Sequence, residues 1–144
     1  MKKETIINLI RNKKYTEISL FLKNYSKEEL NELSNDGETF PLLFAIQNNE
    51  ARHFIFTPEV LEKLDLNMAN KHGTTALMEL AKRGRDEELK TLLKTEVDGY
   101  IQDNEGKTAL DYAKELSANL NYDIGENSFV ELYLEWWERD NPQV

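Results

Sequence analysis

Apolar residues recur at helical spacing along the chain, between polar and charged positions. Several of them lie three or four positions apart on either side of Gly84; they are Leu77, Ala81, Leu89, Leu92 and Leu93. Such spacing places apolar side chains on one face of a helix, where they pack against a neighbour. The pattern therefore predicts one short amphipathic helix before Gly84 and another after it. Two further helical stretches are predicted at 4–14 and 15–24.

The segment SFVELYLEWWERDNP near the C-terminus is predicted to be a helix with two neighbouring apolar stripes. The first stripe is Phe129, Leu132, Tyr133 and Trp136, and the second is Val130, Leu134 and Trp137. A helix at the end of a stack needs only one apolar face. We expect both stripes to be buried in a cap. The alternative is that Trp137 and its neighbours form a contact site, because large aromatic side chains are common in interfaces.

The pattern Gly-x-Thr-Ala-Leu occurs twice, beginning at Gly73 and at Gly106, 33 residues apart. Glycine takes the positive φ that a tight turn requires, and a threonine two positions later can cap the following helix with its side-chain oxygen. Ala81 and Ala113 are small enough for adjacent helices to approach closely. A period of this length indicates repeated units that bury their apolar faces against one another.

These motifs resemble the ankyrin repeat. The resemblance is best in NKHGTTALMELAKRGRDEELKTLLK (70–94) and continues in DNEGKTALDYAKEL (103–116), although both copies have alanine where the family usually has proline. It implies that each unit is a β-turn finger followed by two antiparallel helices. The fold class that follows is an all-α ankyrin-repeat solenoid of about four repeats.

The resemblance divides the chain, read as one domain, into successive repeats. They are a degenerate N-terminal cap at 1–36 and repeats at 37–69, 70–102 and 103–144, the last with an extended C-terminal cap. Gly37 matches Gly73 in its surroundings but lies 36 residues before it, three more than the period. We expect the extra residues in a short helix that begins with Pro58 and is capped by Thr57.

Charge narrows the class of partner. The chain of 144 residues has a formal net charge of −9, and residues 119–144 hold six carboxylates and one arginine, a local balance of −5. Phosphate backbones and anionic lipids would be repelled by such a surface. We therefore expect no nucleic acid and no membrane partner, and favour a basic protein.

Cysteine is absent from the sequence, which excludes disulfides, thiolate nucleophiles and zinc sites with sulfur ligands. No stretch approaches the roughly 18 apolar residues of a membrane span. The first apolar stretch is broken by polar residues within a few positions, unlike the core of a signal peptide. We expect a monomeric protein in the cytoplasm.

Motifs of catalysis and cofactor binding are weak in this sequence. Gly-Lys-Thr at 106–108 has Ile101 where a phosphate-binding loop needs its first glycine. The two histidines, His53 and His72, lie in different repeats and lack the spacing of metal ligands. Neighbouring carboxylates on a helix point in different directions. The sequence therefore predicts a non-enzymatic protein with no catalytic, cofactor-binding or metal-binding residues.

The resemblance implies protein binding through a concave face made of finger tips and first helices. The residues at those positions are Asn35, Asp36, Glu38, Lys71, His72, Thr74, Lys82, Arg83, Asn104, Glu105 and Lys107. The acidic end adds Glu131, Glu135 and Glu138 as charges that attract a basic partner, and Trp137 as an aromatic contact.

Three functions remain open at this point. A small acidic ankyrin protein is similar to cytosolic antitoxin or immunity proteins, inhibitors that neutralise a basic toxin by charge complementarity. A generic scaffold or adaptor is the alternative. A hydrolase or nucleotide-dependent enzyme remains only if its catalytic geometry is not visible as a sequence motif.

Overall fold

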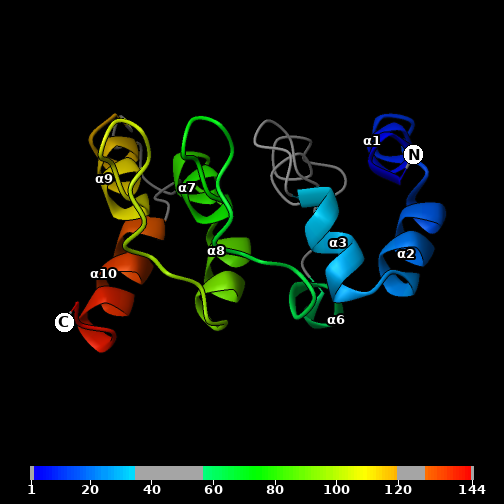
Figure 1. Ribbon diagram of the computed structural model, residues 1–144. Helices are drawn as coiled ribbons and strands as arrows, with labels where there is room; N and C mark the ends of the chain where they lie inside the picture. The colour runs from blue at the N-terminus through cyan, green and yellow to red at the C-terminus, as the bar shows by residue number, and fades with distance from the viewer. Residues whose placement is uncertain (1, 35–56, 120–128, 144) are drawn as a thin grey trace. The chain divides into compact units, whose positions relative to one another are not determined.

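The computed structural model describes residues 2–34, 57–119 and 129–143 (Figure 1). Over these ranges the chain forms helices joined by turns, without a β-strand, which confirms the predicted all-α fold. The chain divides into two compact units, Met1–Lys71 and His72–Val144. None of the helices within the described ranges is long and apolar enough to cross a membrane. The predicted boundaries between repeats stay predictions.

The first unit contains α1, α2, α3 and α6. Their bounds are Lys2–Arg11 for α1, Tyr15–Asn24 for α2, Lys27–Ser34 for α3 and Pro58–Leu61 for α6. α2 has the predicted bounds of 15–24, whereas α1 begins two residues before and ends three residues before the helix predicted over 4–14. The two helices pack against each other. Among the side chains that the structure describes on these two helices, the buried ones are Ile6, Ile10, Ile18 and Leu22.

The helix α3 is not predicted by the hydrophobic pattern. It begins with a capping box, in which the Glu29 amide donates to the Ser26 hydroxyl at 3.2 Å and the Ser26 amide donates to the Glu29 carboxylate at 3.4 Å. The spacing Ser-x-x-Glu is itself a start signal for a helix. This signal in the sequence could have revealed α3.

The short helix α6 begins at Pro58 after Thr57, as predicted, but the Thr57 side chain makes no capping hydrogen bond. The prediction of a side-chain cap is therefore wrong. Proline at the first position fixes φ and has no N–H that needs a partner, so the helical turn forms without a side-chain cap. α6 packs against α2, and the Lys63 ammonium donates to the Lys23 carbonyl at 3.0 Å, in the last turn of α2.

The second unit consists of two helix pairs that lie side by side (Figure 1). The first pair is α7 (Ala76–Lys82) and α8 (Asp86–Leu93), and the second is α9 (Ala109–Asn119) and α10 (Val130–Asp140). α7 packs against α9, and α8 packs against α10. Each copy of the repeated motif thus begins a helix pair that buries its apolar face against the other pair.

The residues predicted to form the apolar seam of the second unit are largely inside it. Leu77, Ala81, Leu89, Leu92 and Ala113 are all buried. Leu93 lies at the edge of the seam and is half-buried. The two alanines have no exposed surface, as expected for positions where neighbouring helices approach closely.

Each pair of helices in the second unit is preceded by a tight turn, the finger of the repeat. φ is 77° at Gly73 and 78° at Gly106, the positive values predicted for both glycines. The Thr75 side chain accepts a hydrogen bond from the Met78 amide at 3.3 Å, and the Thr108 side chain accepts one from three residues further on, also at 3.3 Å. Both threonines therefore cap the following helix, as predicted.

The two fingers of the second unit pack against each other. The Asn104 amide donates to the His72 carbonyl at 3.1 Å. A Cβ atom on Gly73 would lie 2.9 Å from both the Asn104 nitrogen and the Asp103 Cα, whereas one on Gly106 would meet nothing within 4 Å. Gly73 is therefore required for its backbone conformation and for the contact between fingers, and Gly106 for its conformation alone.

The helix α10 buries only one of its two apolar stripes. Val130 and Leu134 are buried and Trp137 is half-buried, while Phe129 is 51%, Leu132 37% and Trp136 46% exposed. The prediction that both stripes are buried is therefore wrong. α10 packs against α8 and α9, and one apolar face is enough for these contacts.

The indole of Trp137 packs on the backbone before the second finger. A Cβ atom on Gly99 would lie 2.8 Å from this ring, and the Tyr100 ring centroid is 5.1 Å from that of Trp137. The Tyr100 hydroxyl donates to the Asn141 carbonyl at 2.6 Å, just after α10 ends. These contacts fix the C-terminal half of α10.

Candidate functional site

The second finger is organised by Asp103. Its carboxylate accepts hydrogen bonds from the amides of Glu105 at 2.9 Å and Lys107 at 3.0 Å, and from the hydroxyl of Tyr112 on α9. The Gly106 amide donates to the Asp103 carbonyl at 2.9 Å and closes the turn. One side chain thus ties the finger to the first helix of its repeat.

The ring of Tyr112 holds two ammonium groups. Lys82 Nζ, from α7, lies 4.4 Å from the ring centroid, and Lys107 Nζ, from the finger, lies 5.4 Å from it. A cation over an aromatic face is attracted by the ring quadrupole, by about 0.5–1 kcal/mol at exposed sites. Because Lys82 and Tyr112 belong to different repeats, their contact joins α7 to α9 at the surface.

Carboxylates pair with the same cations. Lys107 Nζ lies 2.7 Å from the Glu115 carboxylate. Glu79 is 3.7 Å from Lys82 Nζ and accepts a hydrogen bond from Arg83 Nε at 3.2 Å. The Glu79 side chain is 12% exposed, whereas Lys107 and Glu115 are more exposed, and exposed pairs contribute only about 0–1 kcal/mol to stability. Their main effect here is to hold the charged groups in fixed positions.

The pKa values at this cluster move away from neutral pH. Burial raises the pKa of Asp103, but the hydrogen bonds from Tyr112 and two backbone amides outweigh it, so the pKa lies below its usual value. Burial and the hydrogen bond to Asp103 raise the pKa of Tyr112 well above its usual value, and the hydrogen bond to Glu115 raises the pKa of Lys107. Fixed charge states suit a binding surface, whereas proton transfer needs a pKa near the working pH.

Six predicted contact residues lie on the fingers and first helices of the second unit, at or beside this cluster. They are His72, Lys82, Arg83, Asn104, Glu105 and Lys107, and all are exposed or half-buried. Together with Tyr112 we call them the finger surface. Lys82 and Lys107 meet at the Tyr112 ring, and a hydrogen bond joins the two fingers at His72 and Asn104. Arg83 shares the Glu79 carboxylate with Lys82, and Glu105 lies 3.6 Å from Lys107 Nζ.

The other residues predicted for the concave face are placed differently. Thr74 is 6% exposed, because it follows Gly73 where the two fingers meet, so its side chain offers little surface to a partner. Lys71 is exposed at the end of the first unit. Asn35, Asp36 and Glu38 lie outside the described residues, as does His53.

Sequence reasoning missed Asp103 and Tyr112 as members of the site. A shift of 33 residues puts Tyr112 opposite Glu79, so both occupy the same position on successive first helices. Both also contact Lys82. Applying the repeat period to the whole first helix, beyond the Gly-x-Thr-Ala-Leu motif, could have found Tyr112.

Acidic side chains are concentrated on the second helices. α8 carries three carboxylates and one lysine and α10 four carboxylates and one arginine, a net charge of −5. α7 and α9 together carry three carboxylates and two lysines, a net charge of −1. Of the predicted acidic contacts, Glu135 is exposed, while Glu131 and Glu138 are half-buried. Trp137 is half-buried too, and the exposed indole is that of Trp136.

The Gly-Lys-Thr sequence at 106–108 serves the finger and the helix that follows. Gly106 makes the turn, Lys107 pairs with Glu115 and Thr108 caps α9. Within the described ranges, no three histidine or carboxylate side chains gather in the way a metal ion would require.

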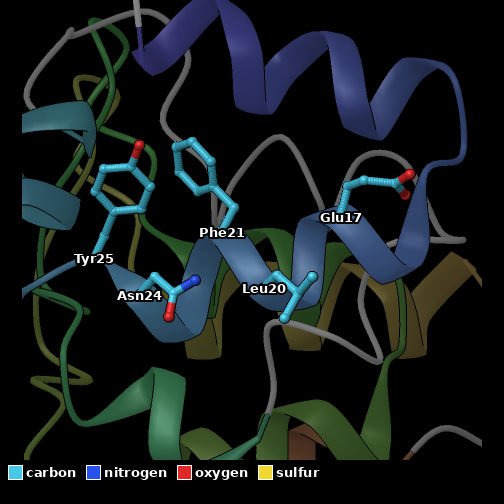
Figure 2. A pocket seen from close by; sticks show the side chains of 5 residues that line it. All are labelled: Glu17, Leu20, Phe21, Asn24 and Tyr25. Atoms are coloured by element: carbon cyan, nitrogen blue, oxygen red, sulfur yellow. The ribbon is translucent and has the colours of Figure 1, made fainter.

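An open hollow of about 540 Å³ lies on the first unit. It is lined by Glu17, Leu20, Phe21, Asn24 and Tyr25. Figure 2 shows that these side chains come from α2 and the residue that follows it, and the rings of Phe21 and Tyr25 have centroids 4.1 Å apart. Catalysis requires polar groups that converge on a reacting atom from different directions. One carboxylate, one amide and one phenol hydroxyl, all from α2 and the residue after it, do not make such an arrangement.

The helix pairs and their fingers define a helical repeat protein. Comparison with known families agrees, because the family described as ankyrin repeats (many copies) matches residues 60–113. The resemblance in the sequence is confirmed over these residues, which match ankyrin repeats. Repeats of this family are modules of protein–protein interaction. No curated protein matches the chain.

Proposed function

We propose that this protein is a non-enzymatic binding module for a basic protein, in which the finger surface contacts acidic and polar groups of the partner and the acidic helices α8 and α10 face its basic groups. We further propose that it acts in the cytoplasm, as a monomer, as an inhibitor of the immunity type. The observation that carries the proposal is the pair of lysines held over Tyr112, at 4.4 and 5.4 Å from the ring centroid. These contacts order long side chains before a partner arrives. Such preorganisation lowers the entropy that binding costs.

The charge distribution supports a basic partner. The chain has a net charge of −9, and α8 with α10 accounts for −5 of it. Complementary charge accelerates encounter and suppresses wrong partners. Glu131, Glu135 and Glu138 supply part of this charge, with Glu135 exposed and the other two half-buried.

Affinity capture from the native host tests the finger surface. The test variant is Lys82→Gln with Lys107→Gln, and the matched control is Lys94→Gln with Lys114→Gln, two exposed lysines outside the finger surface. Both double variants change the net charge equally. We expect wild type and control to retain one basic protein that the test variant retains at least about tenfold less. Thermal unfolding checks that each variant is folded at the capture temperature.

An equal yield from the test variant and the control would contradict the assignment of the finger surface. The inhibitor and the adaptor differ in what happens to the captured protein. We expect addition of wild type to abolish the activity of that partner, in proportion to the complex formed. A partner that stays fully active in the complex would favour the adaptor.

A further inference from the structure

The helix α10 presents an exposed aromatic stripe that its fold does not use. Phe129, Leu132 and Trp136 lie three and four positions apart, so they share one helix face, and all three are exposed. Tyr133 connects them, with its ring centroid 6.2 Å from that of Phe129 and 6.0 Å from that of Trp136. We call these four residues the aromatic stripe.

The packing of α10 rests on its other face. Val130 and Leu134 are buried, and Trp137 lies against Gly99. The Phe129 amide, at the start of α10, donates to the Asp86 carboxylate on α8 at 3.0 Å. The helix is therefore fixed at both ends without the aromatic stripe. Contiguous exposed apolar side chains, large aromatic ones above all, are common at interaction sites.

An acidic stripe runs along the same helix. Glu131, Glu135 and Glu138 lie four and three positions apart and share one helix face, whose edge nearest to the aromatic stripe is Glu135. Arg139 lies between Glu135 and Leu132 in the helical register. The basic groups nearby are Arg139, which pairs with Asp140 at 3.2 Å, and Lys90, whose Nζ lies 5.8 Å from the Tyr133 ring centroid. With these two cations included, α8 and α10 still carry a net charge of −5.

We infer that the aromatic stripe is a docking site for a basic amphipathic helix of another protein. The apolar side of that helix lies on Leu132 and Trp136, and its Lys and Arg side chains reach the acidic stripe. Helices dock onto apolar surfaces in this way through side chains at helical spacing. The inference rests on the proposed function only in that the partner is basic, and it concerns a surface separate from the finger surface.

Charge argues against the other occupants. A second copy of this chain would bring two α10 helices together, each with four carboxylates and one arginine. An anionic lipid surface would repel the same carboxylates. A basic amphipathic helix can pack its apolar side on the aromatic stripe and pair its basic side chains with the acidic stripe.

Synthetic peptides of about five helical turns provide the test. One is amphipathic, with leucines on one face and lysines on the other, and the second has the same composition with the leucines scattered. The test variant is Leu132→Ser with Trp136→Ser. The control is Leu20→Ser, which removes a leucine that is 55% exposed in the other unit. Titration calorimetry on the full chain gives the dissociation constants, and thermal unfolding checks that each variant is folded.

We expect the amphipathic peptide to bind wild type and control alike, and the test variant at least about tenfold more weakly. The scattered peptide should bind all three weakly and equally. The inference is overturned if the test variant binds the amphipathic peptide within about twofold of wild type, or if both peptides bind wild type equally. It is also overturned if sedimentation finds a wild-type dimer that the test variant loses, or if anionic vesicles bind wild type in preference to the peptide.

The proposed function and this inference fail separately. If the Lys82 and Lys107 variant loses the native partner but still binds the peptide, the finger surface is supported. That conclusion does not depend on how the Leu132 and Trp136 variant behaves. Loss of peptide binding by the Leu132 and Trp136 variant supports the aromatic stripe whatever the native partner requires.

Discussion

Gly73 and Gly106 occupy equivalent turns with nearly equal φ, but their surroundings differ. Alanine at Gly106 meets only the cost of a left-handed conformation, so we expect Gly106→Ala to lower the free energy of unfolding by about 1–2 kcal/mol. Alanine at Gly73 also meets the neighbouring finger at 2.9 Å. We expect Gly73→Ala to cost at least about 1 kcal/mol more in urea denaturation. Equal losses would show that the fingers do not pack as described.

Asp103 makes the stability of the finger depend on pH. Its pKa is lower in the folded chain than its usual value of about 3.9. Its contribution is therefore present above that value and is lost as the pH falls through the folded pKa. We expect wild type to be more stable than Asp103→Asn at pH 7, and this difference to shrink below about pH 4. Unfolding of both proteins across the acid range measures it, and a constant difference would contradict the role of the charge.

At the residue scale, the sequence predicts best where backbone conformation dictates the residue type. The turn glycines and the threonine caps follow from local rules, and both are confirmed. The pairing of Gly99 with Trp137 could not be predicted, because it joins residues 38 positions apart and depends on where α10 lies. The contact of the Lys82 ammonium with the Tyr112 ring could not be predicted either, because it joins two repeats and depends on how they pack.

Helix packing in the second unit depends on fully buried leucines. Leu77 on α7 and Leu92 on α8 have no exposed surface, whereas Leu93 is half-buried. We expect Leu77→Ala and Leu92→Ala each to destabilise by about 2–5 kcal/mol, because truncation leaves a cavity. Leu93→Ala is the control and should cost clearly less. Losses below about 0.5 kcal/mol at both buried sites would show that the repeat register is wrong.

At the scale of elements, periodicity predicts a helix more readily than it predicts which face is covered. It gives α1, α2 and the two apolar stripes of α10, but only one stripe is buried. Spacing alone cannot decide this, because both stripes are apolar and the neighbours of α10 are set by tertiary packing. α3 was missed because its start is marked by a capping box and not by an apolar stripe.

Charge is divided within the second unit between two layers of helices. The second helices carry −5 and the first helices −1, so the acidic field and the finger surface lie on different elements. The sequence predicts the acidic end from composition alone. It does not reveal that α8 contributes to the same field, because that follows from the packing of α8 against α10.

The most direct test of the account is the association rate with the captured basic partner at about 50 and 200 mM salt. The test variant neutralises Glu131, Glu135 and Glu138 to glutamine. The control neutralises Glu28, Glu32 and Glu59, three exposed carboxylates of the first unit, and changes the net charge equally. Steering charges act before contact, over about 8–10 Å at physiological salt.

We predict that the test variant associates more slowly than wild type, with a flatter dependence on salt, while its dissociation rate moves less. The control should keep the wild-type association rate. An association rate that is insensitive to salt and to the test variant would contradict recognition of a basic partner by the acidic helices.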